Sequence, residues 1–220
     1  MNCVVTAGPT YEPLDEARRL TNLSTGRLGS ELATCLAAQG HEVVLLLGSG
    51  ATFRTPSRAS RTLEFTTPAD LAARLAALAS GPVDAVFHAA AVSDFGFGRV
   101  FERDAGGGLV ERTDRKIPTS VSNLLVELRP TPKVIAQLRG WFPSARLVGW
   151  KYEVDGDPAS VIAKGLDQIA RNRTDACVVN GPAYGAGFGW VTPAAGCRHW
   201  ADAPALYAAL GAWLAGECAG

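Results

Sequence analysis

Short apolar runs alternate along the chain with segments in which apolar residues recur every three or four positions. The apolar runs predict strands at residues 3–6, 42–47, 62–66, 85–90, 146–150 and 176–180. The periodic segments predict helices at residues 28–40, 67–80, 132–142, 159–172 and 202–216. Strands that alternate with helices in this way are typical of a parallel sheet covered by helices on both faces.

The ends of the predicted helices carry ordinary start and stop signals. Thr67 is a predicted N-cap followed by Pro68 at the first helical position, and Asp202 is a second predicted N-cap. Gly40 follows the first helix, where glycine commonly ends a helix. We therefore expect an α/β fold of the Rossmann-like, doubly wound type with a mostly parallel sheet.

One long segment, at about residues 94–130, breaks this alternation. It reads FGFGRVFERDAGGG, then LVERTDRKIPTS, then LLVELRP, and no helical period runs through it. Apolar and polar residues separated by a glycine-rich turn predict an antiparallel flap or hairpin. We expect residues 1–220 to form a single domain with this flap inserted at the carboxyl edge of the sheet.

The connection between the first strand and the first helix is also unusual. A strand-to-helix loop in such a fold normally takes about 2 to 6 residues. Here about a dozen and a half residues, mostly polar, separate the run at Val4 from the glycine-flanked helix start at Gly26. An insert of that length at the edge where such folds bind ligands predicts a functional role.

Composition excludes several classes of protein. The 220 residues carry 21 Lys plus Arg and 21 Asp plus Glu, so no net charge attracts nucleic acid or an anionic membrane. No apolar run reaches the roughly 18 residues that a membrane span needs. Five widely spaced cysteines without a CxxC pair predict neither a disulfide framework nor a metal site. We expect a soluble, cytoplasmic protein.

In open α/β sheets, ligands bind beyond the carboxyl ends of the strands, and four stretches of this chain should meet there. Each has a functional and a purely structural interpretation at this point. Ser24, Thr25 and Gly26 could hold an anion at a helix start or form a tight turn. Asp94 could face a sugar hydroxyl or cap a strand, and Lys116 could close over phosphates or be solvated. Trp150 could stack on a base or cover the core.

Considered together, the motifs of these stretches resemble one family. VTAGPTYEPLD, LTNLSTGRLG, AAAVSDF, the lysine of DRKI, VGW with a later helical lysine, and CVVN occur in the order found in phosphopantothenoylcysteine synthetases. The resemblance extends from Val4 to about Gly189. It would be the form without a fused decarboxylase domain.

The resemblance implies a phosphopantothenate–cysteine ligase of coenzyme A biosynthesis. The carboxylate of 4′-phosphopantothenate would attack the α-phosphate of CTP, or less favourably of ATP, to give an acyl-cytidylate and pyrophosphate. The amine of cysteine would then displace CMP. Mg²⁺ bound mainly through the triphosphate, a homodimer joined through the flap, and a separate phosphopantothenoylcysteine decarboxylase as a partner are further implications.

The resemblance also implies roles for individual residues. Asn22 would contact the acyl intermediate, and Lys116 would engage the nucleotide phosphates. The other implied nucleotide-binding residues are Ala90, Ala91, Asp94, Pro132, Lys133, Val134, Ile135, Trp150 and Lys164. The long insert would then serve to carry Asn22 over the reacting carboxyl group.

Some positions depart from the family pattern. The family flap reads KxKK, whereas Lys116 is followed here by Ile117-Pro118-Thr119. A divergent relative that binds nucleotide or activates a different carboxylate is therefore the alternative interpretation. A nicotinamide oxidoreductase is disfavoured because the chain has no GxGxxG after the first strand and no Tyr-x-x-x-Lys pair.

Overall fold

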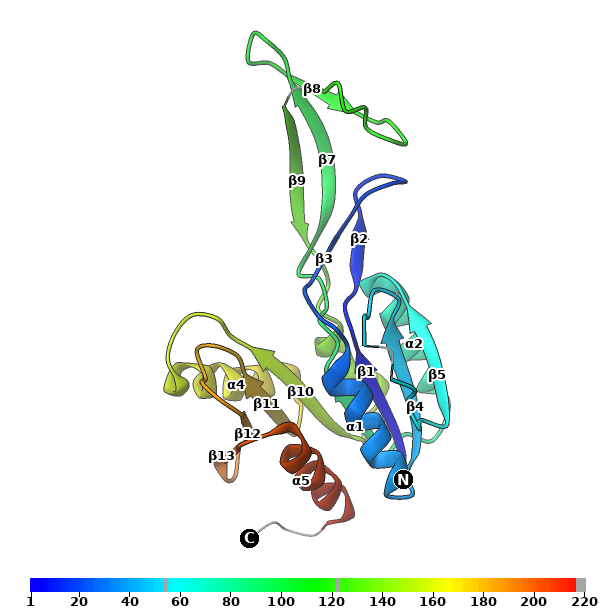
Figure 1. Ribbon diagram of the computed structural model, residues 1–220, viewed down its shortest axis with the longest axis vertical. Coiled ribbons are helices and arrows are strands. Elements are labelled where there is room, and N and C mark those ends of the chain that lie inside the picture. The colour runs from blue at the N-terminus through cyan, green and yellow to red at the C-terminus, as the bar shows by residue number, and fades with distance from the viewer. Residues whose placement is uncertain (54, 122, 217–220) are drawn as a thin grey trace.

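The computed structural model describes residues 1–53, 55–121 and 123–216. Its centre is an eight-stranded sheet with the order β13-β12-β11-β10-β6-β1-β4-β5 (Figure 1). The strands are β1 (Asn2–Ala7), β4 (Glu42–Gly48), β5 (Arg61–Phe65), β6 (Ala85–His88), β10 (Arg146–Tyr152), β11 (Ala176–Asn180), β12 (Phe188–Thr192) and β13 (Gly196–Trp200). The expected α/β fold with a mostly parallel sheet is confirmed.

Strand order reverses at the middle of the sheet. β1 pairs in parallel with β4 on one side and with β6 on the other, and the chain then continues outward from β6 through β10 to β11. Only the last two strands, β12 and β13, run antiparallel to their neighbours. The crevice between β1 and β6 is thus the topological switch point of a doubly wound sheet.

Helices cover both faces of the sheet. The helices are α1 (Arg27–Ala38), α2 (Pro68–Leu78), η1 (Val134–Gln137), α3 (Leu138–Trp141), α4 (Pro158–Asn172) and α5 (Ala203–Ala215). α1 and α5 share one core cluster with β1 and β4, whereas α2, η1 and α3 pack on the opposite side of β1 and β6. α4 packs over β11 and β12 in a third cluster.

The predicted helix ends agree with the structure. Thr67 Oγ1 accepts a hydrogen bond from the backbone N–H of Asp70, and Asp202 caps α5 in the same way. Gly40 follows α1 with φ +85°, a conformation that residues with a Cβ rarely adopt. Local capping chemistry therefore sets where these helices begin and end.

Two antiparallel units project from the carboxyl end of the sheet, as Figure 1 shows. The insert at 94–130 forms a three-stranded sheet, which we call the arm: β7 (Phe95–Arg103), β8 (Leu109–Arg112) and β9 (Leu124–Pro130), in the order β8-β7-β9. The polar insert after β1 forms the β2–β3 hairpin from β2 (Tyr11–Pro13) and β3 (Arg19–Thr21). The antiparallel flap is confirmed, while the β2–β3 pairing was not predicted.

Three predictions about local structure need correction. Residues 132–142 form the 3₁₀ segment η1 and the short α3 rather than one helix, and Gly140 and the nearby Pro143 disfavour a longer one. β6 ends at His88 instead of residue 90 because the Ala90 N–H donates to the Thr6 hydroxyl. β12 and β13 were missed, since their glycines obscure the alternating pattern.

Candidate functional site

The candidate site lies at the switch point, where the chain leaves β1 and β6. Ala91 N–H donates to Gly8 O at 3.0 Å, and Thr10 N–H donates to Ala91 O at 3.1 Å. The Asn22 amide joins this group, since its Nδ2 donates to the same Ala91 oxygen at 3.1 Å. The structure therefore brings together Asn22 and the Ala90-Ala91 backbone, which the sequence predicted to act together.

A chain of hydroxyl contacts holds the segment that carries Asp94. Thr10 Oγ1 accepts a hydrogen bond from Ser93 N–H at 2.8 Å, and both side chains are buried. Thr131 Oγ1 donates to Ser93 O at 2.6 Å, and Thr131 N–H donates to Asp94 O at 2.9 Å. The backbone of Asp94 is thereby fixed between the β2–β3 hairpin and the segment after β9.

The side chains of Asp94 and Lys133 form an exposed ion pair. Lys133 immediately precedes η1, whose Val134 is buried and whose Ile135 packs in the same cluster as Ala90. Pro132 lies between Thr131 and Lys133 and so follows the same hydrogen-bonded segment. The predicted nucleotide-binding residues on either side of the arm therefore meet at its base.

Below this surface, Thr6 connects β1 to β6. Its hydroxyl accepts from Ala90 N–H at 3.1 Å and lies 2.9 Å from His88 Nδ1. Because the oxygen already accepts from Ala90, its proton is available for Nδ1, which favours the tautomer with the ring proton on Nε2. Burial lowers the pKa of His88 to about 4, so the ring is neutral near pH 7.

The helix start beside the site is tightly packed. Gly26 has φ +80° as the N-cap of α1, and a Cβ there would lie 3.0 Å from the Ala51 Cβ. Thr25 accepts the N–H groups of Thr52 and Phe53 on its backbone oxygen, and Ser24 N–H donates to Asn22 O. The N-cap Gly26 has no side chain to cap α1, although Thr25 Oγ1 accepts from Arg27 N–H at 3.3 Å, so later N–H groups of the first turn remain available to an anion.

A second polar group lies one strand further along, after β10. The carboxylate of Glu153 pairs with Lys151 at 3.0 Å and with Lys164 of α4. The hydrogen bond from Lys164 is the main cause that lowers the pKa of Glu153; partial burial opposes it and Lys151 reinforces it. Trp150 packs against the core on the α1 side, and its buried Nε1–H has no hydrogen-bond partner. Lys164, which the sequence placed near the nucleotide, is thus paired with Glu153 in this structure.

Lys116 lies apart from these groups. It sits in the loop after β8, which contacts the tip of the β2–β3 hairpin rather than its base. The five steps of chain from Thr10 to the tip at Asp15, which include the strand β2, span at most about 17 Å. In this conformation the structure does not bring Lys116 next to Asn22 or Asp94.

Sequence reasoning missed several residues that build the site. Thr6, Thr10 and Ser93 are polar residues that are at most 4% exposed, a combination that a sequence alone does not reveal. Glu12 of the hairpin lies against the base of β7, where its Oε2 would be 3.4 Å from a Cβ on Gly96, and burial raises its pKa. The sequence signal for Glu12 was its place in the polar insert after β1, directly before Pro13 of the motif VTAGPTYEPLD.

The residues described offer no preformed metal cage. Within residues 1–53, 55–121 and 123–216, no three His, Cys, Asp or Glu side chains cluster as they would around a metal ion. Asp94, the carboxylate at the strand end, is already paired with Lys133. In that same part of the chain, no helix combines the length and apolar character that crossing a membrane requires.

The fold and the site define a doubly wound α/β domain with a polar ligand site at its switch point. Residues 1–195 match the family model described as the DNA/pantothenate metabolism flavoprotein C-terminal domain, and the chain belongs to that family.

Two curated relatives are longer than this chain. It is 32% identical over 190 residues to a cysteine/cysteine sulfinic acid decarboxylase from an unknown prokaryotic organism, covering 86% of the chain and 48% of the relative. It is 32% identical over 178 residues to the coenzyme A biosynthesis bifunctional protein CoaBC of Thermococcus kodakarensis, covering 80% and 40%. The chain thus spans about half the length of these curated relatives or less.

A solved structure supports the fold. The DNA/pantothenate metabolism flavoprotein from Streptococcus pneumoniae superimposes with a TM-score of 0.85 at 23% identity, covering 98% of this chain and 99% of the other. The arm and the β12–β13 edge therefore belong to a fold that a distant relative shares over its whole length.

Proposed function

We propose that this chain is a phosphopantothenate–cysteine ligase that acts through an acyl-nucleotide in coenzyme A biosynthesis. The observation that carries the proposal is the meeting of Asn22, the Ala90-Ala91 backbone and the Asp94–Lys133 pair at the switch point. The family assignment and the name of the Thermococcus relative support the same pathway. The decarboxylase activity named for the other relative belongs to a protein of which this chain matches only 48%, so that activity is not part of the proposal.

The residues present suit phosphoryl chemistry without a protein nucleophile. Transfer of a nucleotidyl group needs donors and positive charge around the phosphates rather than a covalent intermediate on the protein. Lys133 can exchange its contact with Asp94 for a phosphate, which leaves the Asp94 carboxylate to accept from a ribose hydroxyl. The Asn22 amide can turn from Ala91 O to an oxygen of the acyl group as charge develops there.

The second polar group would extend the nucleotide site. Lys164 and Lys151 present two ammonium groups that Glu153 holds in place, whereas Trp150 packs on the α1 side of the sheet. Ser24, Thr25 and Gly26 would place the start of α1 beside an anionic group of the acid substrate. Since the described residues form no cage of their own, Mg²⁺ would be held chiefly by the triphosphate.

Several finer proposals accompany the main one. CTP is the nucleotide we expect, ahead of ATP, and Lys116 would contact its phosphates. We also propose a cytoplasmic homodimer, with a separate phosphopantothenoylcysteine decarboxylase using the product. These follow from the sequence motifs and go beyond the family assignment.

The direct test is a reconstituted reaction. The protein is incubated with Mg²⁺, 4′-phosphopantothenate, cysteine and either CTP or ATP, while pyrophosphate release and product mass are followed. Asn22→Ala should lower the rate by about a hundredfold or more, as loss of a donor to a developing oxyanion does in other enzymes. Asn2→Ala, at the opposite end of β1, is the matched control and should leave the rate unchanged.

Three results would separate the alternatives. Product formed with either nucleotide, and lost in Asn22→Ala, supports the ligase. Nucleotide binding with no pyrophosphate release in the presence of either nucleotide would refute it and favour a divergent relative that binds nucleotide or activates a different acid. Equal losses in Asn22→Ala and Asn2→Ala would remove the role given to Asn22.

A further inference from the structure

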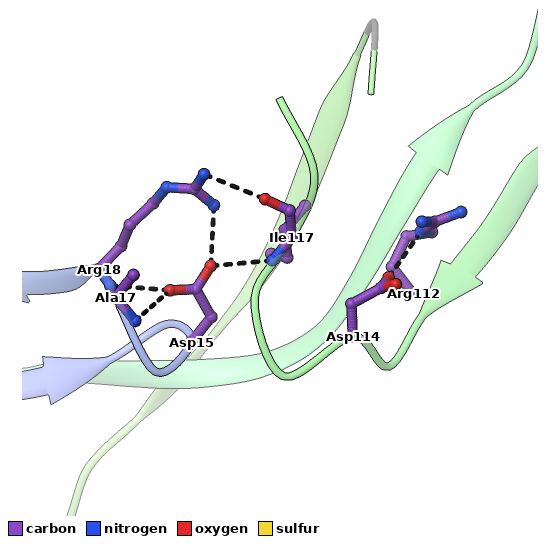
Figure 2. A network of polar contacts seen from close by, with 6 residues as sticks. All are labelled: Asp15, Ala17, Arg18, Arg112, Asp114 and Ile117. Atoms are coloured by element: carbon purple, nitrogen blue, oxygen red, sulfur yellow. Dashed lines mark hydrogen bonds and ion pairs between the residues drawn. The ribbon is translucent and has the colours of Figure 1, made fainter. Parts of the chain in front are cut away.

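The carboxylate of Asp15 joins the tip of the β2–β3 hairpin to the loop that follows β8. Its Oδ1 accepts from the N–H groups of Ala17 at 2.8 Å and Arg18 at 2.7 Å (Figure 2). Its Oδ2 accepts from Arg18 Nη1 at 2.8 Å and from Ile117 N–H at 3.2 Å. The Asp15 side chain is only 1% exposed although it lies on a hairpin tip.

The partners of Asp15 complete a closed ring between the two units. Arg18 Nη2 donates to Ile117 O at 3.1 Å, so both backbone polar groups of Ile117 are bound by the hairpin. The Ile117 side chain is 4% exposed. Beside these contacts, the N–H of Glu16, the residue after Asp15, donates to Arg115 O at 2.9 Å. The loop is therefore held on both sides of Lys116.

The charged residues that directly precede Lys116 in the chain form ion pairs, whereas Lys116 forms none among the residues described. Arg112 pairs with Asp114 at 2.9 Å, and Arg115 pairs with Glu16 at 2.6 Å (Figure 2 shows the first pair). Lys116 is exposed and has no hydrogen bond or ion pair with any residue that the structure describes. The short segment 115–117, which the hairpin binds on both sides of Lys116, thus presents one unpaired ammonium group to an incoming anion.

The Asp15 carboxylate stays ionised under ordinary conditions. Burial raises its pKa, but the N–H groups of Ala17, Ile117 and Arg18 and the charge of Arg18 outweigh burial and hold the pKa below its usual value. The contact with Ile117 therefore persists at the pH at which a ligase would be assayed.

We propose that Asp15 is a positioning residue for Lys116: by binding Ile117 it fixes the loop on the hairpin tip. The ammonium group is thereby held there, away from Asn22 and Asp94, for phosphates that extend from the nucleotide along the hairpin. This inference rests on the proposed function, in which Lys116 contacts the nucleotide. It also links the two predicted catalytic residues, because β3 of the same hairpin leads directly into Asn22.

The first experiment measures the loop itself and needs no substrate. Trypsin can cut after Arg115 or Lys116 only when the loop opens. Asp15→Asn should speed this cleavage by about tenfold or more, with little change in the global melting temperature. Glu16→Gln is the matched control: Glu16 contacts the same loop, but its side chain is 59% exposed, so cleavage should stay close to that of the unmodified protein.

The second experiment asks whether Asp15 acts through Lys116. Ligase rates are measured for Asp15→Asn, Lys116→Ala and the double variant. Asp15→Asn should lower kcat at least fivefold, and adding it to Lys116→Ala should cause no further loss, because a positioning residue has no effect once the group it positions is gone. Arg18→Met, which keeps the carboxylate but removes its guanidinium partner, provides a second variant should Asp15→Asn fold poorly.

Each outcome decides something. Unchanged cleavage in Asp15→Asn and in Arg18→Met would overturn the clamp. Faster cleavage with an unchanged kcat, or additive losses in the double variant, would overturn the positioning role. If the unmodified protein forms no product with any nucleotide, the proposed function fails and the positioning role fails with it, while the cleavage rates still decide whether Asp15 holds the loop.

Discussion

Replacing Thr6 by valine tests the polar contacts that join β1 to β6 beneath the candidate site. Valine has nearly the shape of threonine but lacks the hydroxyl. In Thr6→Val the N–H of Ala90 and the Nδ1 of His88 would lose the group that binds both of them. The site is fully buried, since Thr6 is 0% exposed, so solvent does not readily replace the hydroxyl.

The size of the effect follows from the two partners left unpaired. An unpaired buried donor or acceptor costs about 1 to 3 kcal/mol, so the two together should cost about 2 to 6 kcal/mol. For a chain of this length 1 kcal/mol shifts the melting temperature by about 2 to 4 °C. We therefore expect the melting temperature of Thr6→Val to fall by roughly 4 to 24 °C.

The chain contains a matched control for this experiment. Thr174 is also buried, at 5% exposed, but its hydroxyl has no hydrogen-bond partner. Thr174→Val should be neutral or stabilising, because it removes a polar group that is buried without compensation. Denaturant titration of both variants measures the difference. Equal effects of the two substitutions, or a larger loss in Thr174→Val, would refute the reasoning.

Three further predictions concern stability and reactivity. Since burial lowers the pKa of His88 from its ordinary value of 6.5 to about 4, the unfolded chain binds a proton more readily, and the free energy of unfolding falls as pH decreases from about 6.5 towards 4. The loss is about 2 kcal/mol at pH 5, and urea titrations across this range should show a weaker pH dependence in His88→Gln. Burial raises the pKa of Cys177 to about 12 and that of Cys3 to about 11. After treatment of the folded protein with iodoacetamide, peptide mass mapping should find both thiols unmodified, whereas the less buried Cys35 and Cys197 should react. Cys218 lies outside the described residues. Gly48→Ala would place a Cβ 2.3 Å from Pro9 O and should lower the melting temperature by about 5 °C or more, whereas Gly140→Ala, which meets nothing within 4 Å, should not lower it.

The sequence predicted the parallel part of the fold well because buried strands and capped helices leave local patterns. Residues 176–180 form β11 with the predicted bounds, and α2 begins at Pro68 after the predicted cap. The strands that were missed depend on partners instead. β2 and β3 are each three residues long and pair only across the hairpin. Nothing in such short segments distinguishes a strand from a loop before its partner is known.

The candidate site was predictable where a motif marked it. Asn22 and the segment from Ala90 to Asp94 were placed at the sheet edge by motif and meet there. The buried threonines and the Asp15 contacts could not be anticipated, because Asp15 and Ile117 are 102 positions apart and neither sits in a periodic pattern. The position of Lys116 was equally hidden, since the insert sequence indicates an antiparallel flap but not how far it extends.

The insertion point of the arm bears on how this fold can vary. The arm leaves after β6 and returns before β10, and those two strands pair directly with each other in the central sheet. The parallel core is therefore closed whatever the length of chain between them, and doubling a loop adds only about 0.6 kcal/mol to the entropy of closing it. Natural or engineered variants could lengthen, shorten or exchange the arm, and so change what the protein engages, with little cost to the domain that bears it.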